Sequence, residues 1–268
     1  MEVGSGSEPG RVVRRLKVGR GYSHLKESKL VIECVPEKLQ EKRGVIRSLE
    51  GIIPPASIIG SNTSSIPVSY LQKGARHPDR VLGIHWAEPA HLSRFMEIIC
   101  GNCSNPLYAE RTRKLARNWG KEPSILRKEL GGFIANRCYY ALLREAFHLV
   151  EEGYASIADV DCSVRNDLGY WITFCGPFRY MDITGTPSSY QAVMRDLWPE
   201  LSRNNKVPKM VREIVRSGGR GTSNGRGLYR YTRPEAKRWE QLFMKFTYEI
   251  RALAQNYPED VAFRLGAY

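Results

Sequence analysis

The chain reads Gly83-Ile84-His85-Trp86-Ala87-Glu88-Pro89 at the end of one short apolar run and Met96-Glu97-Ile98-Ile99 inside the next. A strand, a turn and a returning strand over these residues would bring the side chains of His85 and Glu97 together. A carboxylate beside an imidazole fixes its tautomer and raises its basicity, which suits a general base working near neutral pH. The spacing alone leaves open a structural histidine with an unrelated glutamate.

Short apolar runs alternate with stretches of helical spacing over the first half of the chain. Strands are expected at residues 30–36, 57–62, 80–85 and 95–100, and helices at residues 37–49, 66–71 and 108–119. Such alternation is typical of a parallel sheet covered by helices. The first half therefore predicts an α/β domain.

The pattern changes near Leu130. One long helix is expected over residues 133–152, with an apolar stripe on one face and Gly153 where a C-terminal cap belongs. Helical periodicity continues afterwards, with breaks at Gly176-Pro177 and at residues 218–227. We therefore expect a basic N-terminal segment at residues 1–29, an α/β domain at 30–129 and a helical domain at 130–268.

The formal net charge of the chain is +13, from 41 basic and 28 acidic residues. Lys and Arg are scattered from Arg11 to Arg264, without a long basic block interleaved with aromatic residues, so we expect no nucleic-acid partner. The positive charge suits an anionic small-molecule substrate. No apolar run approaches the roughly 18 residues that a membrane helix needs. Because the polar N-terminus also lacks the apolar core of a secretory signal, we expect no membrane partner and a cytoplasmic location.

Six cysteines are present: Cys34, Cys100, Cys103, Cys138, Cys162 and Cys175. Cys100 and Cys103 form a CxxC pair, but a structural zinc site needs a second pair of ligands at similar spacing, and none follows. The pair also comes after an apolar run, whereas redox-active pairs open a helix. We expect reduced thiols and no bound metal.

Six motifs occur in order along the chain: Val31-Ile32-Glu33-Cys34-Val35-Pro36-Glu37, Ser61-Asn62-Thr63-Ser64-Ser65, Gly83-Ile84-His85-Trp86-Ala87-Glu88-Pro89-Ala90, Gly132-Phe133-Ile134-Ala135-Asn136-Arg137, Gly176-Pro177-Phe178 and Gly225-Arg226-Gly227-Leu228-Tyr229. Together they resemble the 3-hydroxyacyl-CoA dehydrogenase family. The resemblance implies a partial Rossmann-type parallel sheet followed by a helical C-terminal domain that forms a homodimer. It also implies an NAD-dependent oxidoreductase. The hydride would pass between NAD and the 3-hydroxyl carbon of an acyl-CoA or related hydroxy acid.

The resemblance also implies roles for individual residues. His85 matches the family's base and Glu97 the carboxylate that orients it, while Ser64 and Asn136 match residues that hold the substrate near its hydroxyl and the cofactor. Glu37 and Lys42 match positions that contact the dinucleotide, together with Ser64.

Plainer interpretations of the same residues remain open. Ser64 is also placed to cap a helix, because Thr63 and Ser64 precede Ile66. Asn136 is also typical of a helix entry. Lys42, taken alone, is an ordinary solvated lysine.

The chain departs from the family at its beginning. Members begin with a strand and a GxGxxG turn, whose glycines let the backbone approach a pyrophosphate. Residues 4–10 have the wrong spacing for that turn, so we interpret residues 1–29 as a remnant of the dinucleotide-binding half. A truncated, non-catalytic or structural homologue is therefore the alternative.

Glu88 stands where the family usually has Asn. We expect this change to alter the substrate, and related dehydrogenases of this fold act on hydroxy acids that lack coenzyme A.

Overall fold

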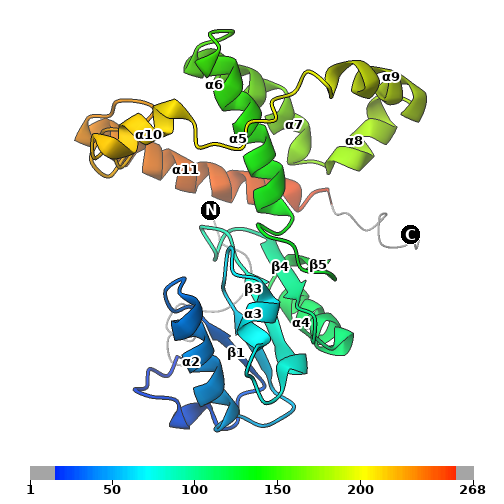
Figure 1. The fold of residues 1–268 in the computed structure, drawn as a ribbon, viewed down its shortest axis with the longest axis vertical. Helices are drawn as coiled ribbons and strands as arrows, with labels where there is room; N and C mark the ends of the chain where they lie inside the picture. Colours follow the sequence, from blue (N-terminus) through cyan, green and yellow to red (C-terminus); the bar gives the residue numbers. More distant parts are fainter. Residues whose placement is uncertain (1–15, 258–268) are drawn as a thin grey trace. The chain divides into compact units, whose positions relative to one another are not determined.

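The computed structural model describes residues 16–257, which form parts of two compact units (Figure 1). Unit 1 holds the chain up to Trp86 together with Phe95–Phe133. Unit 2 holds the segment Ala87–Arg94 and the chain from Ile134 onward. The chain therefore passes between the units three times. The first 15 residues of the expected basic N-terminal segment lie outside the described residues.

Unit 1 is built on a five-stranded sheet. Its strands are β1 (Leu30–Glu33), β2 (Ile58–Ser61), β3 (Val81–His85), β4 (Phe95–Cys100) and β5 (Glu122–Leu126), arranged in the order of the sequence. β1, β2 and β3 are mutually parallel, β4 runs antiparallel to β3, and β5 is parallel to β4. The prediction of a parallel-dominated α/β sheet is confirmed, but β5 was not anticipated.

Helices cover both faces of the sheet, namely α2 (Leu39–Glu50), α3 (Val68–Gln72) and α4 (Pro106–Asn118), with short 3-10 turns η1 (Ser23–Leu25) and η2 (Pro78–Arg80). Successive strand residues point to opposite faces. Ile59 and Val81 accordingly pack with α2 and α3, whereas Ile58, Leu82 and Ile84 pack with α4. His85 therefore shares the face of Val81, on the α2 and α3 side.

Gly83 brings α3 close to this part of the sheet. A Cβ atom there would lie 3.0 Å from the Ile99 side chain and 3.1 Å from that of Val68. Glycine thus leaves room for a buried cluster of Val68, Ile99 and Phe133 beside the end of β3.

Unit 2 is helical apart from isolated bridges near residues 221–230. Its helices are α5 (Ala135–Glu151), α6 (Ile157–Asn166), α7 (Leu168–Ile172), α8 (Pro177–Thr184), α9 (Pro187–Leu197), α10 (Lys209–Arg216) and α11 (Arg233–Ala254). Capping boxes at Ser156, Thr186 and Thr232 begin α6, α9 and α11. The expected all-helical second domain is confirmed.

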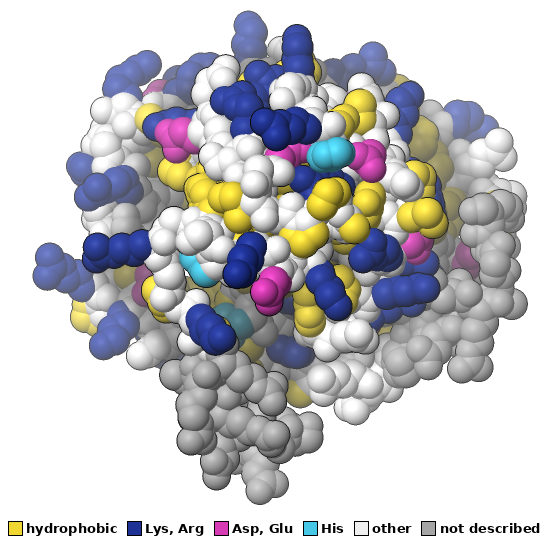
Figure 2. Space-filling model, turned by 90° about the horizontal axis from the view of Figure 1, so that it is seen from below, with side chains coloured by type: hydrophobic (Ala, Val, Ile, Leu, Met, Phe, Trp, Pro, Cys, Tyr) yellow, Lys and Arg dark blue, Asp and Glu magenta, His cyan; other side chains and the backbone are white. Residues whose placement is uncertain are grey.

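Basic side chains are spread over the face of the molecule seen in Figure 2, with apolar and acidic side chains between them. No single cationic patch dominates that view. Among residues 16–257, no helix combines the length and apolar character that crossing a bilayer requires. The same residues contain no group of three or more His, Cys, Asp and Glu side chains arranged to hold a metal ion.

Candidate active site

His85 and Glu97 are direct partners in the antiparallel ladder between β3 and β4. Residues opposite each other in such a ladder point to the same face, so the two side chains meet. His85 Nδ1 lies 2.9 Å from Glu97 Oε2. The side chains are 8% and 1% exposed, respectively. The strand, turn and returning strand expected from the sequence therefore produce the imidazole–carboxylate pair.

Two aromatic rings hold the same imidazole from its sides. The ring centroid of Phe95 lies 5.6 Å from that of His85 at an interplanar angle of 88°, and that of Phe133 lies 5.5 Å away at 62°. Both are edge-to-face arrangements, which favourably align the ring charge distributions. Among the described residues, Glu97 is the one hydrogen-bond partner of the ring, at Nδ1. Nε2 is therefore left for an external partner.

Glu37, in the loop between β1 and α2, organises the serine turn that follows β2. Its Oε1 accepts from Thr63 Oγ1 at 2.6 Å and from the backbone N–H groups of Ser64 and Ser65 at 3.0 and 3.1 Å. Burial alone would raise the pKa of Glu37. These hydrogen bonds and the nearby Lys42 ammonium outweigh it and hold the pKa below its ordinary value.

Ser64 is exposed within this turn, and the hydroxyl of the neighbouring Thr63 closes the turn before α3. Thr63 Oγ1 accepts from the backbone N–H of Ile66 at 2.9 Å. The N-cap residue of α3 is Pro67, which makes no side-chain cap. The capping interpretation of Ser64 is therefore wrong, while its role at the substrate stays a prediction.

Lys42 is fully buried on α2, which corrects its interpretation as a solvated lysine. Its Nζ donates to Glu33 Oε1 at 2.9 Å, to Glu33 Oε2 at 3.1 Å and to the Val35 carbonyl at 3.1 Å. Ser61 Oγ donates to the same Glu33 carboxylate. An ammonium has three hydrogens, so none is left over. Lys42 is thus not a solvated lysine; it ties α2 to the end of β1, and its contact with a dinucleotide stays a prediction.

The carboxyl ends of parallel strands meet at one edge of a sheet, where open α/β sheets bind ligands. Glu37 follows β1, Ser64 follows β2, and His85 ends β3, so these three residues gather at that edge. Asn136 is the second residue of α5, in unit 2. Its place beside the other three stays a prediction.

The residues at this edge fit the reacting end of a dinucleotide better than its pyrophosphate. They are the imidazole of His85, which can act as a base, the exposed hydroxyl of Ser64, and the turn that the Glu37 carboxylate holds. Of the described connections from strand to helix, residues 34–38 and 62–67 contain no glycine, residues 101–105 contain one and residues 127–134 contain two. A pyrophosphate-binding turn with three glycines is therefore not among the described residues.

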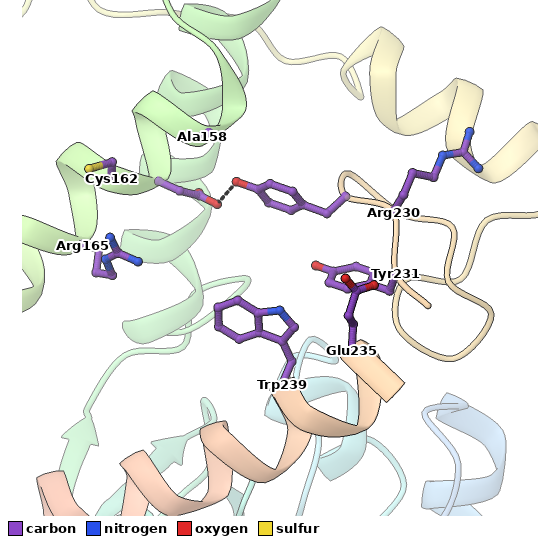
Figure 3. A pocket seen from close by; sticks show the side chains of 9 residues that line it. Ala158, Cys162, Arg165, Arg230, Tyr231, Glu235 and Trp239 are labelled. Carbon is purple, nitrogen blue, oxygen red and sulfur yellow. Dashed lines mark hydrogen bonds between the residues drawn. The ribbon is translucent and has the colours of Figure 1, made fainter. Parts of the chain in front are cut away.

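A cavity lies wholly within unit 2, between α6, α11 and the loop that precedes α11 (Figure 3). Its volume is about 470 Å³, and Tyr231 and Trp239 form part of its lining. Its carboxylates already have partners: Tyr229 donates to Asp161 at 2.8 Å, and Thr232 Oγ1 donates to Glu235 at 2.7 Å. We assign this cavity no chemistry.

The six cysteines are free thiols. Cys100 is buried at the end of β4, and burial raises the pKa of its thiol. This environment disfavours the thiolate that redox or metal chemistry requires.

Two family models match the chain. The 3-hydroxyacyl-CoA dehydrogenase NAD binding domain matches residues 3–129, and the C-terminal domain of the same family matches residues 132–231. Among curated proteins, the 5-formyl-3-hydroxy-2-methylpyridine 4-carboxylate 5-dehydrogenase of Mesorhizobium japonicum is 37% identical over 78% of this chain and 67% of its own length. L-carnitine dehydrogenase of Oceanobacillus iheyensis is 31% identical over 66% of this chain and 58% of its own length.

Solved structures agree with these relationships. A crystal structure of the same pyridine-carboxylate dehydrogenase, described as an NAD+ dependent dismutase, superposes with a TM-score of 0.83 at 33% identity. The match covers 87% of this chain and 75% of that one. For 3-hydroxybutyryl-CoA dehydrogenase of Escherichia coli K12 the TM-score is 0.67 at 28% identity, over 82% of this chain and 46% of that one.

A Rossmann-like nucleotide-binding sheet, an oriented histidine at its carboxyl edge and a helical second domain define an NAD-dependent oxidoreductase. More particularly, the chain belongs to the 3-hydroxyacyl-CoA dehydrogenase family, as its motifs predict.

Proposed function

We propose that this chain transfers hydride between NAD and the alcohol carbon of a small hydroxy acid, with His85 as the general base. One observation carries the proposal. The His85 imidazole is held through Nδ1 by the buried Glu97 carboxylate, and its Nε2 is left for substrate at the carboxyl edge of the sheet. Alcohol oxidation requires a base that is held in position through one ring nitrogen while its other nitrogen can accept the substrate proton.

The proposed reaction divides its tasks among a few groups. In oxidation, the substrate O–H proton passes to His85 Nε2, the C–H electron pair leaves as hydride, and a carbonyl remains; reduction is the reverse. Bound NAD supplies the hydride acceptor or donor. Glu97 keeps the proton of the neutral imidazole on Nδ1 and stabilises the imidazolium that forms.

Ser64 and Asn136 would position the substrate oxygen with a hydroxyl and an amide. Glu37 supports this arrangement by holding the turn that carries Ser64.

The substrate proposed is a carboxylate-bearing alcohol or aldehyde without coenzyme A. The pyridine-carboxylate dehydrogenase is more similar to this chain than the 3-hydroxybutyryl-CoA enzyme, with TM-scores of 0.83 and 0.67. Glu88 in the catalytic segment also departs from the family's usual residue. A 3-hydroxyacyl-CoA of fatty acid metabolism is the second candidate, supported by the matched C-terminal domain. A cytoplasmic location belongs to the same proposal.

We also infer a homodimer through unit 2. Within its described residues, α5, α7, α8, α9 and α10 contain no buried residue. Large apolar side chains stand exposed there, including Tyr139 at 54%, Phe174 at 52%, Phe178 at 82% and Trp198 at 62%. A helical domain needs a shared core for its apolar faces. A second copy supplies one, because identical faces are self-complementary in a two-fold dimer.

The test is NADH oxidation by the purified chain, read by absorbance, with 5-formyl-3-hydroxy-2-methylpyridine 4-carboxylate, 3-dehydrocarnitine and acetoacetyl-CoA as separate substrates. We expect turnover with a substrate that lacks coenzyme A, and its loss in His85→Asn. His77→Asn is the matched control, because His77 is exposed and bonds Glu50 through its backbone N–H.

Turnover that survives His85→Asn would refute the assignment of the base. Wild-type chain that is inactive with all three compounds and does not bind NADH would favour the non-catalytic homologue.

A further inference from the structure

Phe133 has a backbone conformation that its side chain disfavours. Its φ is +53°, and among the described residues it is the one non-glycine residue with positive φ. The preceding Gly132, at φ +79°, shares the left-handed region without penalty. For a bulky residue this region is an outlier. Strained residues of this kind concentrate at functional sites, where the surrounding structure enforces them.

The strain places the Phe133 ring in a fully enclosed position. Phe133 is 1% exposed, and its ring packs with Val68 at the start of α3 and Ile99 on β4. The same ring meets the His85 imidazole, with centroids 5.5 Å apart at 62°. Replacing Phe133 with glycine would relieve the backbone strain but would remove the contact between this ring and the His85 imidazole. The conformation therefore brings the aromatic ring into an edge-to-face arrangement with the imidazole.

The turn that carries Phe133 is tied to α3 at its start and closed by a backbone hydrogen bond of its own at its end. Ser69 N, in the first turn of α3, donates to Glu129 Oε2 at 2.8 Å. Phe133 N donates to the Leu130 carbonyl at 3.1 Å, which closes the turn. Gly131 and Gly132 lie between these two anchors. Although the turn is rich in glycine, the ring at its end is held in one place.

We infer that Phe133 is a positioning residue for His85, fixing the imidazole plane that Glu97 alone leaves free to tilt. One hydrogen bond at Nδ1 defines an axis, whereas an imidazole aimed at a substrate needs its rotation defined as well. The ring planes of Phe133 and Phe95 lie at 62° and 88° to the imidazole plane. This inference rests on the proposed role of His85, but its test does not depend on turnover.

The test compares Phe133→Leu with Val68→Ala in the full chain. Leu keeps an apolar side chain but removes the aromatic edge. Val68 belongs to the same buried cluster, which makes Val68→Ala a control for packing loss. The first readout is the side-chain ¹⁵N NMR spectrum of histidine-labelled protein, with the His85 signals assigned by their absence in His85→Asn. We expect the His85 signals to shift and broaden in Phe133→Leu and to stay in place in Val68→Ala.

The second readout is the division of the effect between kcat and KM. In Phe133→Leu we expect kcat for NADH oxidation to fall about tenfold or more while KM for NADH stays nearly unchanged, because a misoriented imidazole impairs proton transfer and not cofactor binding. Phe133→Met, of similar volume, replaces Phe133→Leu if the latter does not fold.

Equal His85 spectra and equal kcat values in the Phe133 and Val68 variants would overturn the inference. If His85→Asn retains turnover, the proposed base is wrong. The NMR comparison would still decide whether Phe133 orients the ring.

Discussion

The backbone N–H of Ser64 donates to Glu37 Oε1 over 3.0 Å, so a carboxylate that follows β1 holds the turn that follows β2. The same oxygen accepts from Thr63 and Ser65. A single acidic side chain thus sets the position of the hydroxyl proposed to meet substrate. Glu37, assigned from the sequence to the dinucleotide, has a structural task in the apo chain as well.

We predict that Glu37→Gln loosens this turn. A neutral amide cannot accept as strongly from one hydroxyl and two N–H groups, so stability should fall by about 1–2 kcal/mol after allowance for solvent exposure. Urea unfolding measures this loss, and Glu41→Gln, at an exposed carboxylate that pairs with Lys38, is the matched control.

The effect of Glu37→Gln should depend on pH in one direction. Because the pKa of Glu37 in the folded chain lies below its ordinary value of 4.5, the carboxylate stabilises the fold fully above that pH. Its contribution disappears as pH falls through the lowered pKa. Unfolding curves of wild type and Glu37→Gln should therefore differ at pH 7 and converge in acid. A difference that grew on acidification would contradict this account.

Glu97→Gln should remove most turnover while leaving the fold intact. The amide can donate to His85 Nδ1, which moves the imidazole proton to Nε2 and leaves no lone pair for the substrate proton. We expect kcat to fall by about 10²–10⁴-fold. Steady-state kinetics measures it, with Glu110→Gln, a carboxylate on α4 that pairs with Arg113, as control. Full activity in Glu97→Gln would refute the orienting role.

Lys42→Met should destabilise unit 1 strongly. It leaves the Glu33 carboxylate, in a residue only 4% exposed, without its cation. Breaking one side of a buried ion pair costs about 3–5 kcal/mol. The double variant Lys42→Met with Glu33→Gln should recover part of that loss, because the two effects are coupled. Additive losses in urea unfolding would show that the two side chains act independently.

Phe178→Arg tests the homodimer. Phe178 is 82% exposed in the single chain, where such a change should cost little. In a dimer that covers this face, the charge would be buried, so the variant should sediment as a monomer at concentrations where wild type is dimeric. Lys114→Glu, on the exposed side of α4, should leave the mass unchanged. A monomeric wild type would overturn the dimer.

The sequence allowed the His85–Glu97 pair to be predicted because two short apolar runs around a turn leave few pairings that bury both. It did not reveal β5, because the run Glu122–Leu126 is short and contains Pro123, which argues against a strand. The burial of Lys42 depended on a partner, Glu33, that lies nine residues away on another element. Local spacing carries no information about such a tertiary contact.

The aromatic support of His85 was missed for a related reason. Phe133 was expected to begin a helix, whereas the structure places it in a left-handed turn and begins α5 at Ala135. The Gly131-Gly132 pair was the available signal, because glycines commonly mark left-handed turns.

The threefold passage of the chain between units limits how this protein can be divided. His85 lies one residue before the first crossing, Phe95 opens the return, and Phe133 ends the last stretch of unit 1. A cut after Phe133 would not release two self-sufficient fragments. The N-terminal piece would keep Leu92, 2% exposed in the intact chain, and the C-terminal piece would lose the His91 carbonyl that accepts from Arg251. Any version of this protein that separates unit 2 or moves it to another protein must therefore keep the segment Ala87–Arg94 with the helices of unit 2.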